Sequence, residues 1–318
     1  MATTFLKRLD RPVLAAGGAI VLLLVAGGLY SSSFVSPAYL LQQLQVAAFL
    51  GVVATGLMLV ILLGHIDLSV PWVITMGGMM SVAAGGWTRP FSWLAIPFAV
   101  LCGLGMGLFN GFGVAYLRIP SMIFTLGVNA IAQGLMIVHT SGFAPQDHAT
   151  ATMQLLAVGR SIFGIPNAVW VWAAVGGLTV VLLNRTAFGR RVYAIGNNER
   201  AVFLSRANCN LVVVGCFAAA GALSGLAGAL LAGYSTKAYQ AMGDPYLLPA
   251  IAAVVLGGTN ILGGRGRYLG TVIGVVVITL LQSMLSIVQM PEAGRQVTYG
   301  LVIVGMLLTY GRGDRNGG

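Results

Sequence analysis

Charged side chains are scarce in this sequence. Only 8% of its 318 residues are Asp, Glu, Lys or Arg, whereas an average soluble domain contains about 25%. A soluble protein of this length needs a charged surface to remain dissolved. Because 58% of the residues are hydrophobic, the missing polar surface is best explained as a surface that faces lipid.

Sequence patterns typical of catalysis and of metal binding are also missing. The seven acidic residues are dispersed, and no GxSxG or HExxH sequence occurs. The three cysteines form no CxxC or Cys/His cluster, so neither a disulfide framework nor a metal site is expected. The chain also has no phosphate-binding GxxxxGK[ST] loop. We therefore expect no enzyme, no ATP hydrolysis by this chain, no catalytic residue, no metal and no cofactor of its own.

Ten apolar runs are present instead. Most of them approach the roughly 20 residues that cross about 30 Å of hydrocarbon as a helix. Their apolarity is uniform, without the alternation of a membrane β-barrel. The sequence therefore predicts an all-α polytopic membrane protein with about ten transmembrane helices, in a single transmembrane domain over residues 1–318. The runs lie at approximately 13–30, 45–63, 70–86, 91–116, 121–138, 168–183, 211–233, 247–263, 268–288 and 297–310.

The basic residues predict the orientation of these spans. With the N-terminus inside, 13 of the 17 Lys and Arg residues fall on the cytoplasmic side and four fall outside. Ten spans then place both termini in the cytoplasm. The same bias explains the net charge of +10, so nucleic acid is not expected as a partner. Two connections exceed a simple turn, a periplasmic loop at about 141–167 and a cytoplasmic loop at about 184–210.

The 45 glycines have a use in a bilayer, because small residues let helix backbones approach closely. Several of them follow small-xxx-small spacing, which predicts tight helix–helix contacts. These are Gly103, Gly107 and Gly111, Gly221 and Gly225, and Gly270 and Gly274.

Polar residues near or inside the spans are few. Asp67 lies in GHIDLSVP (64–71), between two apolar runs, and an ionisable residue at membrane depth is a functional candidate. Alternatively, Asp67 and Ser69 cap the helix that begins near Pro71. Thr125 and Asn129 lie within the fifth run, where such side chains either hydrogen-bond between helices or line a polar path.

The segment AIAAVVLGGTNILGGRGRYLGTVIG, at 250–274, contains a second candidate. Its break at 257–260 interrupts an apolar run, where freed backbone groups need partners or line a wet cavity. Interrupted helices of this kind are common at transport sites. Thr259 and Asn260 are therefore candidates for a translocation pathway.

The cytoplasmic loop contains AIGNNERAVFLS, at 194–205. Asn197 and Asn198 can cap a helix, and Glu199 in its first turn suits the helix dipole. A partly apolar face follows, which predicts a short amphipathic helix. Such a helix either lies among lipid headgroups or docks into a groove of a soluble partner.

Together with IPSMIFTLG (119–127), these segments resemble the ribose-type permeases of ABC sugar importers. The family patterns are AIAAVVLGGTSLxGGxGxxxGTxxG, AIGGNxxAAxLSG, PxFIxTLG and GGIDLSVG, and their order and spacing match from about residue 45 to 310. The chain departs from the last pattern at His65 and Pro71, where the family usually has Gly.

The resemblance implies the permease of an ATP-driven importer in the bacterial inner membrane. Two permease chains, identical or different, would pair with two ATPase subunits that hold ATP and Mg²⁺. A periplasmic binding protein would deliver a small sugar, which crosses the lipid membrane by alternating access. The family's ATPase-coupling helix corresponds to Gly196, Asn197, Glu199, Ala201 and Ser205.

The translocation pathway remains a prediction from residue types. A neutral sugar needs no fixed counter-charge, so small and amide side chains suit its path. The candidates are Asp67, Ser69, Thr125, Asn129, Thr259 and Asn260. The alternative function is a proton-coupled secondary transporter of a small solute, with Asp67 or His139 as the proton relay.

Overall fold

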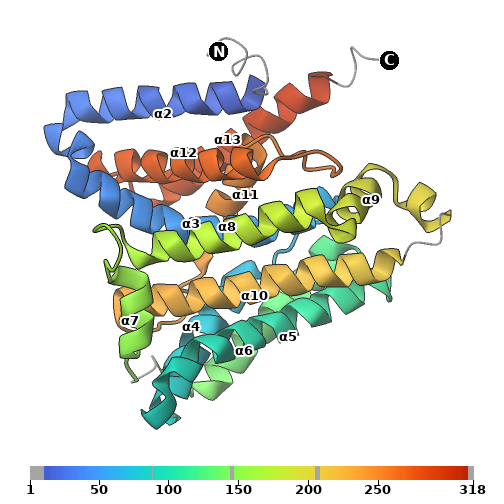
Figure 1. Cartoon of the computed structure of the whole chain (residues 1–318), viewed down its shortest axis with the longest axis horizontal. Helices are drawn as coiled ribbons and strands as arrows, with labels where there is room; N and C mark the ends of the chain where they lie inside the picture. Colours follow the sequence, from blue (N-terminus) through green and yellow to red (C-terminus); the bar gives the residue numbers. More distant parts are fainter. Residues whose placement is uncertain (1–10, 88, 144–146, 205–207, 314–318) are drawn as a thin grey trace.

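The computed structural model describes residues 11–87, 89–143, 147–204 and 208–313, and these residues are largely helical (Figure 1). The longer helices are α2 (Arg11–Tyr30), α3 (Pro37–Leu62), α4 (Val70–Trp87), α5 (Ala95–Ala115), α6 (Ser121–His139), α8 (Asn167–Arg185), α10 (Cys209–Ser235), α12 (Tyr268–Ile287) and α13 (Glu292–Gly313). The shorter ones are α7 (Ala151–Val158), α9 (Ala187–Leu204) and α11 (Leu247–Leu256), with 3₁₀ turns η1 (Ser32–Val35), η2 (Arg89–Leu94) and η3 (Asp244–Tyr246).

The predicted spans coincide with helices. Six helices in the described part of the chain, α3, α5, α6, α8, α10 and α12, are long and apolar enough to cross a membrane. Shorter apolar helices occupy Ala16–Tyr30, Val70–Gly86 and Asp244–Leu256, and α13 covers the tenth run. The prediction of an all-α polytopic membrane protein is confirmed. The eighth run is helical only as far as Leu256, so the predicted break begins at Gly257.

Helix α3 lies at the centre of the bundle. Every residue of α3 from Ala47 to Leu62 is buried, as expected for a helix that is apolar on all sides. Helices α8, α10, α11 and α12 pack around it. In contrast, α2 and α6 leave large apolar side chains exposed, including Leu29 and Val138. These faces are available to lipid or to another chain.

Glycine-lined contacts hold neighbouring helices together, as their spacing predicts. The most extensive helix pair is α5 with α10. A Cβ atom added at Gly103 would collide with the backbone of Gly221, and one added at Gly221 would collide with the backbone of Gly103. Gly270 of α12 and Gly257, which follows α11, meet in the same way. Close backbone contact of this kind replaces the hydrophobic driving force that is absent in lipid.

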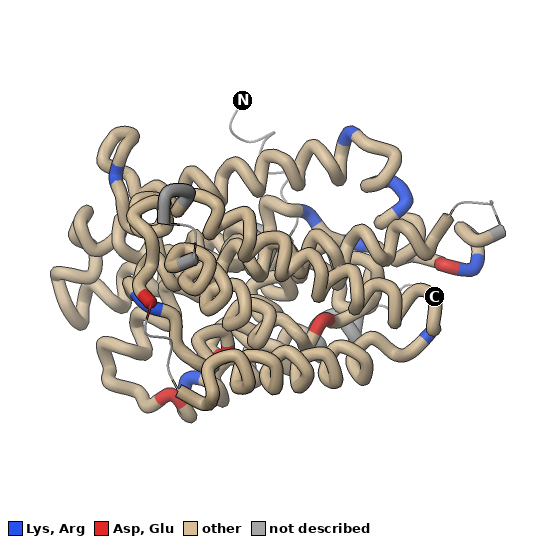
Figure 2. Tube along the Cα trace, turned by 90° about the horizontal axis from the view of Figure 1, so that it is seen from below, with Lys and Arg blue, Asp and Glu red and all other residues tan. Residues whose placement is uncertain are grey.

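The two ends of the bundle differ in charge and in the elements that they carry. The start of α2, the end of α13 and the whole of α9 lie toward the same end (Figure 1). Most Lys and Arg residues also lie toward that end (Figure 2). The start of α2 and the end of α13 thus lie toward one end of the bundle, and the positive-inside rule predicts that this end is the cytoplasmic one. The loop at 141–167 lies at the other end and contains the short helix α7.

The close approach of α5 and α10 gives a test of the packing. We expect Gly103→Val to destabilise the protein by about 3 kcal/mol or more, because the new side chain has to displace the α10 backbone. Gly105→Val is a matched control on the same helix, since a Cβ there meets nothing within 4 Å. It should change stability by no more than about 0.5 kcal/mol. Thermal unfolding in detergent measures both, and equal effects would contradict the packing.

Candidate functional site

Helix α9 is bent into two pieces at Asn198. The backbone there is extended, with φ −162° and ψ 94°. The Asn198 side-chain oxygen accepts a hydrogen bond from the N–H of Ala201 at 3.1 Å, so Asn198 caps the second piece, as predicted. The first piece begins already at Ala187, before the predicted helix start.

The first piece of α9 is held by the connection between α11 and α12. Asn197 does not cap a helix; its side-chain Nδ2 donates to the carbonyl of Gly264 at 3.1 Å and to that of Tyr193 at 2.8 Å. The Tyr193 hydroxyl donates to the carbonyl of Gly266 at 2.9 Å. Two side chains of α9 therefore satisfy carbonyl groups of the glycine-rich connection.

Gly196 brings α9 into backbone contact with two other segments. A Cβ at this position would collide with the Leu62 carbonyl at the end of α3 and with the backbone of Gly264. The N–H of Gly264 in turn donates to the Leu62 carbonyl at 2.9 Å. The end of the central helix, the α11–α12 connection and α9 thus meet at one junction.

The second piece of α9 is tied to the connection between α5 and α6. Glu199 forms an ion pair with Arg118 at 2.7 Å, and Arg118 also donates to the Asn210 side chain at 3.3 Å. The Arg118 and Glu199 side chains are 55% and 42% exposed, so the pair contributes at most about 1 kcal/mol. It orients α9 more than it stabilises it. Arg118 is not among the predicted site residues, although a basic residue beside a span was a usable signal.

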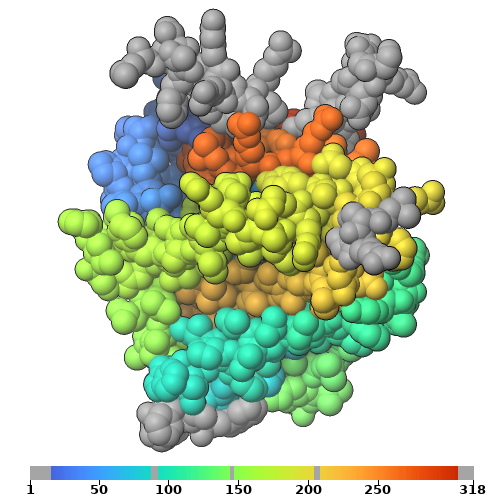
Figure 3. Space-filling model, turned by 45° about the vertical axis from the view of Figure 1, so that its right-hand side comes forward, coloured from blue at the N-terminus to red at the C-terminus, as the bar shows by residue number. Residues whose placement is uncertain are grey.

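The far side of the second piece faces outward. Ala201 is exposed, and Phe203 is 65% exposed. Val202 packs against the core instead. Ser205 lies outside the described residues. Figure 3 shows the surface of α9, in yellow, between the orange C-terminal part of the chain and the gold surface of α10. An exposed Phe on this surface is the kind of side chain that anchors a protein contact.

His65 lies beside the ion pair of Arg118 and Glu199. Together with Arg118, Ser121 and Glu199, it lines a cavity of about 550 Å³. Burial lowers the pKa of the His65 imidazole, and the nearby Glu199 carboxylate partly opposes this effect. The imidazole is therefore mainly neutral at pH 7.

Asp67 belongs to an extended segment, 65–69, between α3 and α4. Polar side chains spaced four residues apart on one face of α6 accept hydrogen bonds from backbone N–H groups of this segment and of the first turn of α4. The Ile66, Leu68 and Trp72 N–H groups donate to Ser121 Oγ (3.3 Å), Thr125 Oγ1 (2.9 Å) and Asn129 Oδ1 (3.3 Å). In this structure, Thr125 and Asn129 therefore satisfy backbone groups rather than line an open path.

The Asp67 carboxylate is the centre of a buried cluster. Its Oδ1 accepts from the Ser69 N–H at 2.9 Å and from the Ser69 hydroxyl at 2.6 Å. Asn110 of α5 donates to Ser69 Oγ at 2.7 Å. Burial raises the pKa of the Asp67 carboxyl, which lies outside the spanning helices, and the hydrogen bonds from Ser69 lower it in part. Asp67 thus satisfies the backbone N–H of Ser69, the residue before α4, within an enclosed cluster. Its helix-capping role and its pathway role both stay predictions.

Thr259 and Asn260 lie apart from this cluster, in the turn that follows α11. The Asn260 N–H donates to the Arg265 carbonyl at 2.8 Å, and its side chain accepts from the Leu262 N–H at 3.1 Å. Thr259 is buried beside Gly266, and its hydroxyl has no hydrogen-bond partner among the described residues. The six pathway candidates thus fall into two groups.

These features define a class of protein. It is an all-helical, multi-pass membrane protein with a helix, α9, that joins three connections at one end of the bundle. Its sequence contains no phosphate-binding GxxxxGK[ST] loop.

Comparison with known proteins places the chain in a family within this class. Residues 39–308 match the family described as "Branched-chain amino acid transport system / permease component", and the chain belongs to this family.

Individual relatives match over most of their length. The chain is 35% identical to Ribose import permease protein RbsC of Bacillus subtilis (strain 168) over 286 residues, covering 90% of this chain and 88% of the relative. It is 32% identical over 288 residues to the protein of the same name in Haemophilus influenzae, covering 90% and 89%. It is also 32% identical over 299 residues to Autoinducer 2 import system permease protein LsrC of Salmonella paratyphi B, covering 92% and 84%. No solved structure matches the chain.

Two substitutions distinguish whether Asp67 acts as a hydrogen-bond acceptor or through its negative charge. Asp67→Asn keeps an oxygen acceptor for Ser69, so we expect little change in thermal stability. Asp67→Leu leaves the backbone N–H and the hydroxyl of Ser69 without their acceptor and should cost about 1–3 kcal/mol. Asp244→Leu, at an exposed position, is the control. If Asp67→Asn destabilises the protein as much as Asp67→Leu, the charge itself is required.

Proposed function

We propose that the chain is the transmembrane permease subunit of an ATP-driven ABC importer in the bacterial inner membrane. Its substrate is a small sugar of the ribose type, carried from the periplasm to the cytoplasm by alternating access. Support for the sugar comes from the names of the relatives that share 32–35% identity over 90% of this chain. The four sequence segments that resemble ribose-type permeases support the same substrate class.

The observation that carries this proposal is the position of α9. The helix contacts the end of α3, the α5–α6 connection and the α11–α12 connection. A force applied to α9 from the cytoplasm therefore reaches three places where spans begin or end. Gly196, Asn197 and Glu199 make these contacts, while Ala201 and Phe203 remain available to a partner.

The other components of such an importer would be separate chains. Two ATPase subunits would bind ATP and Mg²⁺ and dock on α9. A second permease chain, identical or different, would complete the pathway, and a periplasmic sugar-binding protein would supply the sugar. The proton-coupled alternative needs Asp67 or His139 as a relay, and the enclosed contacts of Asp67 give it no support.

The proposal predicts an ATPase contact through Phe203. A tagged chain purified in mild detergent from its own host should carry an ATP-hydrolysing subunit, and Phe203→Ser should remove most of that activity from the eluate. A lost aromatic anchor typically costs about 2 kcal/mol or more of binding free energy, or roughly thirtyfold in affinity. Phe163→Ser is the matched control, because Phe163 is 92% exposed but lies in the loop at the opposite end. Equal ATPase recovery from both variants would contradict docking on α9.

Uptake measurements separate the two modes of energy supply. Vesicles that contain the chain, its ATPase and the binding protein should take up labelled ribose only when ATP is present inside. Asp67→Asn should retain this uptake if the variant folds. Uptake by the chain alone, driven by a proton gradient and abolished by Asp67→Asn, would refute the importer.

A further inference from the structure

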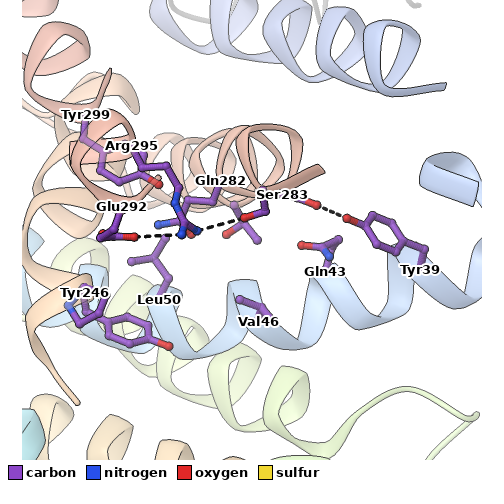
Figure 4. Close-up of a pocket in the computed structure, with 13 residues that line it drawn as sticks. Tyr39, Gln43, Val46, Leu50, Tyr246, Gln282, Ser283, Glu292, Arg295 and Tyr299 are labelled. Carbon is purple, nitrogen blue, oxygen red and sulfur yellow. Dashed lines mark hydrogen bonds and ion pairs between the residues drawn. The ribbon is translucent and has the colours of Figure 1, made fainter. Parts of the chain in front are cut away.

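Figure 4 shows a cavity whose lining includes several polar side chains. It lies where α3 begins and α12 ends, at the end of the bundle opposite α9 (Figure 1). Its volume is about 300 Å³, and it is bounded by the start of α3, the η3 turn, the end of α12 and the start of α13. Small-molecule sites usually range from about 300 to 1,000 Å³, so the cavity suits a small solute. It is separate from the Asp67 cluster and from the α9 junction.

The lining is rich in hydroxyl and amide groups. Gln43 of α3 and Gln282 of α12 contribute amides, and Thr279 and Tyr299 contribute hydroxyls. Figure 4 shows Gln43, Gln282 and Tyr299 around the same space. None of these four residues is among the predicted pathway candidates, because they come from helices that are remote from one another in the chain.

The charges in the cavity are balanced. Arg295 forms an ion pair with Glu292 at 3.2 Å and donates to Ser286 Oγ at 3.1 Å. The pair has no net charge, so the cavity offers hydrogen bonds without selecting an anion or a cation. Its polar lining also distinguishes it from a groove for a lipid chain.

Two polar atoms of the lining are buried without a partner. Thr279 is 2% exposed, and its hydroxyl has no hydrogen-bond partner among the described residues. The Nε of Arg295 is in the same situation. Buried polar atoms are nearly always hydrogen-bonded in folded proteins, so these two atoms indicate a bound polar molecule.

We infer that this cavity binds a small, neutral, polyhydroxylated solute of the size of a monosaccharide, held by Thr279, Gln282, Gln43 and the Glu292–Arg295 pair. Such a solute carries donors and acceptors around a compact ring and matches a hydrogen-bonding lining that has no net charge. The inference deepens the proposed function, on which it rests. It places a sugar contact in the outer half of the permease, on the side where a periplasmic binding protein would release its ligand.

A protection experiment tests this inference. Val46 lines the cavity and makes no polar contact, so Val46→Cys introduces a reporter thiol in the purified complex. The rate of its modification by a methanethiosulfonate reagent is measured with ribose, xylose, galactose or myo-inositol at millimolar concentration, and the unaltered chain supplies the background from its own cysteines. At least one of these solutes should slow the modification in a saturable manner.

A second substitution tests whether protection of the thiol depends on a side chain that lines the cavity. Thr279→Val keeps the side-chain shape and removes a hydroxyl that has no protein partner, so folding should be preserved. The half-protection concentration should rise about five- to tenfold, the effect of one lost hydrogen bond. Thr298→Val on α13 is the matched control, since its hydroxyl donates to the Gly294 carbonyl and it does not line the cavity.

The possible outcomes separate the inference from the proposed function. If no solute protects the thiol while the same complex shows ATP-driven sugar uptake, the importer stands and the inference fails. If a solute protects but Thr279→Val changes nothing, the cavity holds structural water and the inference also fails. If protection depends on Thr279 but no ATPase couples to the chain, the site stands and the importer is refuted.

Discussion

Backbone groups that are buried away from water must find their hydrogen-bond partners inside the protein, and outside the helices they cannot use the helical pattern. Two non-helical stretches, 65–69 and 257–267, lie at the end of the bundle that carries α9. The first obtains its partners from one polar face of α6. The second obtains them from its own turn, from the end of α3 and from Asn197 of α9. Helices α6 and α9 thus supply hydrogen-bond acceptors and donors to two short non-helical segments of backbone.

Sequence reasoning succeeded where the signal is local. Apolar runs predicted the spans, and glycine spacing predicted tight helix–helix contacts, although not that α5 and α10 are partners. Asn198 caps a helix, as predicted. Sequence reasoning could not assign partners to Thr125 or Asn129, because each bonds to a residue 57 positions away in the chain. The start of α9 at Ala187 was not predicted either, although Phe188, Val192 and Ile195 have the i, i+4, i+7 spacing of an apolar helix face and pack toward the core. The outer cavity combines residues more than 200 positions apart, which no local pattern reveals.

The two anchors of α9 differ in kind. The first piece is fixed by backbone contact at Gly196 and by the Asn197 side chain. The second is tethered by a solvent-exposed ion pair, which salt and water weaken. Under load, the bend at Asn198 separates a firmly held part from a loosely held one. A partner that grips the second piece therefore pulls first on the α5–α6 connection and only then on the end of the central helix.

The placement of α2 determines the order in which the bundle is completed. Apart from the adjoining η1 turn, α2 packs mainly against α12 (Figure 1), whose first residue, Tyr268, is synthesised 238 positions after Tyr30. At roughly 5–20 residues per second, the ribosome needs on the order of 10–50 s to cover that distance. During this interval α2 has to remain stable in lipid without its main partner helix. Its exposed apolar side chains, Val21, Leu22, Val25 and Leu29, suit contact with lipid. Helix α2 is thus synthesised long before the helix against which it mainly packs.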